Sequence, residues 1–215
     1  METAATEFLN EKKKRLEKRL ATFGITDRRI THLPYLEHHP ESFQSPHDAG
    51  CRMFILYAVA TVSYFPDERY AFINLLKDNN MWDLTTSEEQ DFLLDKNDAD
   101  EKTNDMAWKF DAARTLAWCL NLFDDVHPID RIATQDEDSE FMEFIMNTRD
   151  NIPAFLRELY FRPLEEIHEE YLLNELAMEH CRDNALNSRA DNTNIKWPIC
   201  SERHNVLTWL TTLSS

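Results

Sequence analysis

The chain has 215 residues with 40 acidic and 23 basic side chains, which gives a formal net charge of −17, and only two residues are glycine. Two glycines are too few for the loops that bind phosphates or dinucleotides, or for the nucleophile turn of α/β hydrolases. The acidity argues against nucleic-acid binding, which requires clustered lysine and arginine. No apolar run is long enough to span a membrane, and the amino terminus lacks a secretory signal. We therefore expect a cytoplasmic protein without a membrane span.

The cysteines offer no metal-binding or redox motif. They stand at positions 51, 119, 181 and 200, far apart and without a Cys-x-x-Cys pair. The sequence therefore predicts free, buried thiols, and we expect no cofactor.

Apolar residues recur at helical spacing through most of the chain, whereas strand-like alternation is hard to find. This pattern predicts an all-α protein, with about eight helices and no significant sheet, that forms one compact domain over residues 1–215. Within residues 1–24, an amphipathic helix over 6–22 should end at Gly24, a residue suited to the left-handed helix stop. Six basic residues lie on its second face. This basic face either contacts an acidic partner or a membrane surface, or is simply solvated.

The next helix has the clearest start signal. Ser45 is a good N-cap and Pro46 suits the first helical position, so a helix should run over 46–65 and end before Pro66. It is apolar nearly all round, which predicts the central helix of the core, and Gly50 inside it indicates close packing. Further helices are expected over residues 67–78, 85–94, 104–123, 141–146, 164–187 and 198–213, with a polar loop over 95–105.

One short motif has the spacing of a metal site. Glu165-x-x-His168 places a carboxylate and an imidazole three residues apart on one helix face, as in di-iron helical bundles. A complete site of that kind needs a second Glu-x-x-His motif, which the chain lacks. The alternative interpretation is a solvated acidic helix face.

The last predicted helix carries polar residues inside an otherwise apolar pattern, namely Glu202, Arg203 and His204. Charged residues in such a position usually find partners. We expect Arg203 to bind a carboxylate of the long acidic helix, and Glu202 to meet Arg52 or Arg114. Such a network is either a polar functional site or an internal clasp.

Several stretches together resemble a known bacterial family, the domain of unknown function numbered 4272. The stretches occur in the order of the family and cover about residues 30–212: Leu33-Pro34, the run from Ser45 to Ala60, Trp108-Lys-Phe-Asp-Ala with Trp118, Arg162 with Glu166-Ile167, and Ser201-Glu-Arg-His with Leu207-Thr-Trp-Leu210. The resemblance implies an all-helical domain and no particular activity. It adds Arg162 to the polar-network candidates, which are Arg52, Arg162, Glu202, Arg203 and His204.

The acidic residues favour a binding function. They gather over residues 78–105, with ten acidic residues and two lysines, over 136–143, and over 165–170. A dense negative field steers a cationic partner, so our first hypothesis is a non-enzymatic protein that binds a basic protein. An immunity protein that neutralises a basic toxin is one concrete form. The candidate partner-surface residues are Asp95, Asp98, Asp100, Glu101, Asp136, Glu137 and Asp138.

Two alternatives stay open at this point. One is a metal-dependent or other enzyme that uses the Glu, His and Arg residues named above, although the sequence identifies no catalytic residue. The other is a structural helical scaffold, and self-association is compatible with either.

Overall fold

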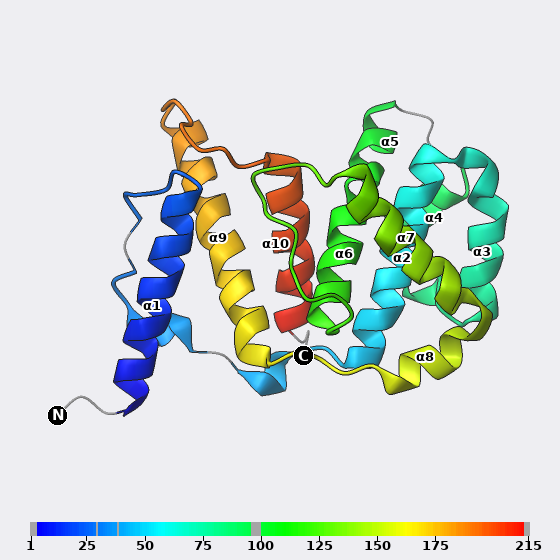
Figure 1. Cartoon of the computed structure of the whole chain (residues 1–215). Coiled ribbons are helices and arrows are strands. Elements are labelled where there is room, and N and C mark those ends of the chain that lie inside the picture. Colours follow the sequence, from blue (N-terminus) through cyan, green and yellow to red (C-terminus); the bar gives the residue numbers. More distant parts are fainter. Residues whose placement is uncertain (1–3, 29, 38, 96–99, 213–215) are drawn as a thin grey trace. The chain divides into compact units, whose positions relative to one another are not determined.

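The computed structural model describes residues 4–28, 30–37, 39–95 and 100–212. These residues form α-helices and short 3₁₀ helices without a strand, which confirms the all-α prediction (Figure 1). Eight of the α-helices contain eight or more residues, in agreement with the expected number. None of the described helices has the length and apolar character needed to span a membrane. The α-helices are α1 (Ala4–Thr22), α2 (Pro46–Tyr64), α3 (Arg69–Asp78), α4 (Ser87–Leu93), α5 (Asp100–Ala107), α6 (Lys109–Cys119), α7 (Gln135–Thr148), α8 (Ile152–Glu158), α9 (Leu164–Leu186) and α10 (Trp197–Thr211).

The chain divides into two compact units. The terminal unit comprises residues 1–43, 128–132 and 162–215, and the central unit comprises residues 44–127 and 133–161. The single domain expected from the sequence stays a prediction.

In the terminal unit, α9 contacts both α1 and α10. Leu16 and Leu20 of α1 are buried, as are Ile199 and Leu207 of α10. Gly24 has φ +89°, in the left-handed region, and ends the helical segment of α1, as predicted. The apolar face of each amphipathic helix thus lies in this core, and the loop after α1 begins at the expected residue.

The central unit is built around α2. Thirteen of its residues are buried, and it contacts α3, α4, α5, α6 and α8, which confirms the predicted central apolar helix. The Ser45 hydroxyl accepts a hydrogen bond from the backbone N–H of Asp48, 3.1 Å away, and so caps the first turn. Around Tyr57, the rings of Phe72 and Phe141 pack edge to face at centroid distances of 5.9 and 5.8 Å.

Two predicted helix boundaries were wrong. The helix expected over 104–123 begins earlier, at Asp100, and is divided at Trp108 into α5 and α6, so part of the predicted polar loop is helical. The helix expected over 141–146 is the longer α7, which starts after Thr134. There the Thr134 hydroxyl and the Glu137 carboxylate form a reciprocal capping box, a Thr-x-x-Glu signal that was present in the sequence.

Other residues take the place of glycine where the chain needs a left-handed backbone. Asn80, Asp95, Asn121 and Ser188 all have φ between 51° and 59°. Asparagine and aspartate tolerate this region better than most residues because their short polar side chains hydrogen-bond locally. The low glycine content is therefore compatible with tight helix ends.

Gly50 lies where α8 packs against α2, and we predict that Gly50→Ala destabilises the protein. A Cβ atom there would come within 2.4 Å of Leu159 Cδ1 and 2.6 Å of Leu156 Cδ2, so both leucines would have to move. Overpacking of this kind costs about 1–3 kcal/mol, which exceeds the roughly 1 kcal/mol that alanine gains over glycine in a helix. Urea unfolding measures the difference. The double variant Gly50→Ala/Leu159→Ala should lose less free energy of unfolding than the sum of the losses in the two single variants. A Gly50→Ala protein that is more stable than the unchanged protein would contradict the prediction.

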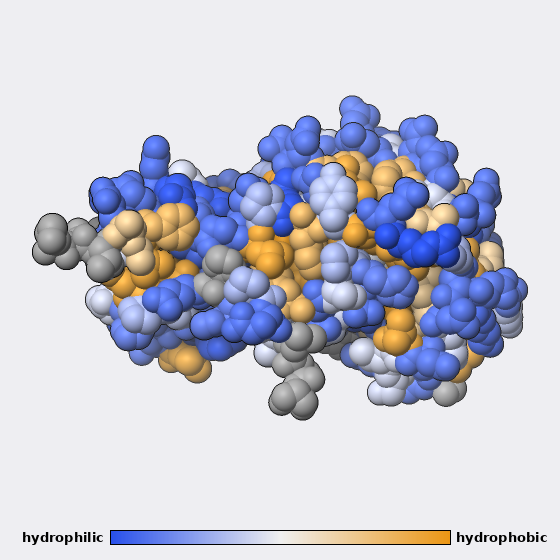
Figure 2. Space-filling model, turned by 90° about the horizontal axis from the view of Figure 1, so that it is seen from below, coloured by the Kyte–Doolittle hydropathy of each residue, from blue (hydrophilic) through white to orange (hydrophobic). Residues whose placement is uncertain are grey.

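Hydrophobic side chains reach the surface in several places. On the face shown in Figure 2, orange hydrophobic patches interrupt a surface that is mostly blue and hydrophilic. Among the described residues of the central unit, the large apolar side chains with substantial exposure are Tyr64, Phe65, Tyr70, Leu84, Leu94, Met146 and Tyr160. Exposed aromatic residues that gather in one place are typical of interaction surfaces.

Candidate partner-binding surface

The negative charge of the chain resides mainly in the central unit. That unit contains 23 acidic and nine basic residues, a net charge of −14, whereas the terminal unit contains 17 acidic and 14 basic residues, a net charge of −3. The field that would steer a basic partner therefore belongs to the central unit.

Within the terminal unit, the acidic stretch 165–170 is already paired. Arg15 donates three hydrogen bonds to Glu169, the shortest from Nη2 to Oε2 at 2.8 Å, and Arg19 Nη2 lies 2.6 Å from Glu170 Oε2. These contacts join the basic face of α1 to the acidic face of α9 (Figure 1). The stretch is therefore not the free acidic surface that we expected, and part of the basic face of α1 has an internal partner.

The two metal-site candidates, Glu165 and His168, face a lysine. Lys12 Nζ lies 2.7 Å from Glu165 Oε1 and 2.9 Å from His168 Nδ1, and it donates to the Leu36 carbonyl oxygen at 2.7 Å. Three partners match the three donors of an ammonium group. Burial lowers the pKa of Lys12, and the neighbouring Glu165 opposes this by favouring the charged form. The ammonium group of Lys12 thus lies between the two side chains that were considered as metal ligands.

On α10, Arg203 is buried, with 2% of its surface exposed. His204 stacks with Tyr171 at a ring-centroid distance of 6.2 Å, and Tyr171 also stacks with His168 at 5.9 Å. Burial lowers the pKa of His204, which favours the neutral form of its imidazole. This aromatic stack is a contact that helical spacing alone did not reveal.

The remaining polar-network candidates are divided between the units. Arg52, in the central unit, forms a bidentate pair with Glu89 at 2.8 and 2.6 Å, a partner we did not expect. Arg162, in the terminal unit, lies 3.7 Å from Glu166, four residues further along the chain. Glu202 also lies in the terminal unit. The predicted contacts of Glu202 and Arg203 with carboxylates or arginines stay predictions.

The cysteines are all free and buried, as predicted. Burial raises the pKa of Cys51 to about 11 and that of Cys200 to about 12, so both thiols are protonated at neutral pH. No group of three or more possible metal ligands occurs in the described part of the chain.

The partner-surface candidates on α7 differ in their exposure. Asp136 is exposed, whereas Glu137 caps the helix through its hydrogen bonds with Thr134. Asp138 lies 3.1 Å from Arg114 Nη1, and burial together with the neighbouring charge of Glu137 raises its pKa more than Arg114 lowers it. Of these three carboxylates, Asp136 is the one most available to a partner.

The candidates near α4 and α5 are less informative. Asp95 forms an ion pair with Arg69, so its charge is partly compensated. Asp98 lies outside the described residues, and so do the side chains of Asp100 and Glu101, whose backbone belongs to the first turn of α5. The predicted role of these four residues in partner binding stays a prediction.

A hollow beside α7 brings carboxylates and aromatic rings together. Its volume is about 410 Å³, and it is lined by Leu122, Phe123, Asp124, Glu140, Glu143, Phe144 and Asn147. None of these lining residues is basic. Glu140 and Glu143 are exposed, and the rings of Phe123 and Phe144 pack edge to face at 5.4 Å. We call this site the acidic hollow.

The acidic hollow is suited to cationic side chains. A lysine or arginine that enters it would meet both carboxylates and aromatic rings of the lining, and both kinds of group can attract cations. Sequence reasoning placed Glu140 and Glu143 in an acidic stretch but did not single them out. Their spacing of three residues, which sets them on one face of α7, was the available signal.

Comparison with known proteins identifies the family of this chain but assigns no activity. The model of the family described as domain of unknown function DUF4272 matches residues 12–215, nearly the whole chain. The chain therefore belongs to this family, as the sequence resemblance indicated. No curated protein and no solved structure matches the chain.

Proposed function

We propose that this member of the DUF4272 family is a non-enzymatic binding protein whose central unit recognises a basic protein partner. The observation that carries the proposal is the charge distribution. The central unit has a net charge of −14, and its acidic hollow combines exposed carboxylates with aromatic rings and has no basic residue in its lining. A basic surface on a partner would be complementary both to the negative charge of the unit and to the carboxylates of the hollow.

The proposal in its most specific form is an immunity protein that neutralises a basic toxin in the cytoplasm. Such a protein has to bind its toxin quickly, and electrostatic steering raises association rates by about 10- to 1,000-fold. A non-enzymatic role is supported by the engagement of the residues that we considered for chemistry. Lys12 lies between Glu165 and His168, and the thiol pKa values of Cys51 and Cys200 are raised by burial.

Neutralising the acidic hollow should weaken binding of a basic partner. For the double variant Glu140→Gln/Glu143→Gln, we expect the affinity for a lysine-rich peptide to fall by about fivefold to thirtyfold, because two surface ion pairs contribute roughly 1–2 kcal/mol together. Calorimetric titration at low salt measures this affinity. The same variant should capture less of a basic partner from a lysate of the native host.

The matched control removes two carboxylates elsewhere. Glu7 and Glu37 are exposed residues of the terminal unit, so Glu7→Gln/Glu37→Gln changes the total charge equally. We expect less than about a twofold effect from it, because neither Glu7 nor Glu37 belongs to the lining of the acidic hollow. Equal losses for the two double variants, or binding that is indifferent to salt, would contradict the proposal.

A further inference from the structure

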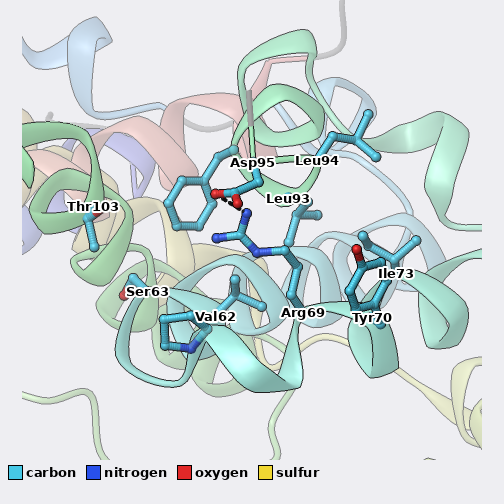
Figure 3. A pocket seen from close by; sticks show the side chains of 11 residues that line it. Val62, Ser63, Arg69, Tyr70, Ile73, Leu93, Leu94, Asp95 and Thr103 are labelled. Carbon is cyan, nitrogen blue, oxygen red and sulfur yellow. Dashed lines mark ion pairs between the residues drawn. The ribbon is translucent and has the colours of Figure 1, made fainter. Parts of the chain in front are cut away.

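A second pocket of the central unit lies where α3 and α4 meet the end of α2 (Figure 3). Its volume is about 460 Å³, within the range of pockets that bind small molecules or side chains. Most of its lining is apolar, and these residues are Val62, Pro66, Ile73, Phe92, Leu93 and Leu94. We call it the α3–α4 pocket.

The cation inside the α3–α4 pocket is already compensated. Figure 3 shows the guanidinium of Arg69 directed towards the carboxylate of Asp95, with which it forms an ion pair. Arg69 Cζ also lies 5.8 Å from the ring centroid of Phe92, a cation–π contact. Since the charge of Arg69 has these two partners, a side chain that enters the pocket would mainly contact the apolar residues of its lining.

Exposed apolar side chains border the pocket. Tyr70 and Leu94 belong to its lining and are 79% and 43% exposed. Large apolar groups exposed together beside a pocket are typical of a site where a partner inserts an anchor residue.

The edge of the pocket is acidic. Asp67 and Glu68 follow Pro66 directly, are exposed, and form no ion pair with any described residue. Asp95 also lines the pocket but is paired with Arg69, so the attraction comes from Asp67, Glu68 and the strong negative charge of the central unit. A partner segment that inserts an apolar side chain into this pocket would therefore bind more tightly if basic residues flank that side chain.

We infer that the α3–α4 pocket receives an apolar anchor side chain from a basic, amphipathic helix of the protein partner. This inference rests on the proposed function, because it assumes a basic partner and specifies how that partner is held. Charge attracts the segment, and insertion of a leucine-like side chain into the pocket fixes its position.

The test separates apolar anchoring from charge attraction. One probe is a helical peptide of leucine and lysine with leucines at positions i, i+3, i+4 and i+7, and the other is a lysine-only peptide of equal charge. Leu94→Glu adds a negative charge inside the pocket, while Leu84→Glu adds the same charge at a leucine that is 54% exposed and lies outside the pocket lining. If charge alone acts, both variants bind both peptides at least as well as the unchanged protein.

For the amphipathic peptide, we expect Leu94→Glu to weaken binding by about tenfold and Leu84→Glu to leave it unchanged or slightly tighter. Tyr70→Asp, at a more exposed lining residue, should repeat the loss if Leu94→Glu is unstable. Equal behaviour of the pocket and control variants would overturn the anchor inference while the lysine-only peptide still binds. If neither peptide binds in a salt-dependent manner, the proposed function fails, and the anchor inference fails with it.

Discussion

Replacement of Lys12 by alanine is expected to lower the free energy of unfolding of the terminal unit by about 3–5 kcal/mol. The side chain is fully buried, and its ammonium group contacts Glu165, His168 and the Leu36 carbonyl oxygen. Alanine removes these three interactions together with a packed aliphatic stem. Urea unfolding measures the loss, and faster amide hydrogen exchange in α1 and α9 would locate it.

An exposed lysine of the same helix provides the control. Lys14 pairs with Glu11 on the surface of α1, where the two side chains are 70% and 56% exposed, so Lys14→Ala should change stability by less than about 0.5 kcal/mol. Lys12→Met keeps most of the stem and should recover part of the loss. A cost below about 1 kcal/mol for Lys12→Ala would show that the ammonium contacts do not hold α1 in place.

Local signals in the sequence predicted most of the helices and several of their ends. Ser45 with Pro46 marked the start of α2, and Gly24 marked the stop after α1, because caps depend on a few neighbouring residues. The start of α7 at Thr134 was missed although the same kind of signal was present. The break at Trp108 lacks such a signal, since neither proline nor glycine stands there.

Contacts between distant segments were harder to predict. Periodicity shows that Lys12 and Glu165 lie on particular helix faces, but it does not show which helix lies opposite. Lys12 and His168 are 156 positions apart, and their contact depends on the packing of α1 against α9. The acidic hollow is a similar case, because it combines residues 122–124 with the middle of α7. Charge patterns therefore suggested a type of partner, which stays a prediction, but they did not show the shape of the site.

Glu89→Ala is expected to destabilise the central unit by about 3–5 kcal/mol, because it leaves a partly buried arginine without its counter-charge. Glu89 is 3% exposed, accepts two hydrogen bonds from Arg52, and accepts a third from the backbone N–H of Thr86 at 2.9 Å. One side chain therefore both pairs with α2 and caps α4. Urea unfolding followed by far-ultraviolet circular dichroism measures the effect.

A second capping box in the same unit supplies the control. Glu137 caps α7 as Glu89 caps α4, but its side chain is 32% exposed, whereas that of Glu89 is 3% exposed. Glu137→Ala should therefore cost only about 1 kcal/mol, the usual value of a lost helix cap. Comparable losses at the two positions would show that the Arg52 pair adds little beyond capping.

The Arg52–Glu89 pair should also make stability depend on pH. Burial raises the pKa of Glu89, but the hydrogen bonds and charge of Arg52, together with Thr86, outweigh it, so the pKa lies below its ordinary value of 4.5. Because the folded protein holds this proton less tightly than the unfolded chain, the stabilisation is complete above pH 4.5 and declines as the pH falls through the folded-state pKa. Glu89→Gln cannot ionise, so its stability should fall less steeply with acid than that of the unchanged protein. If urea unfolding shows that the free energies of unfolding of the two proteins fall equally with decreasing pH, Glu89 does not contribute this stabilisation.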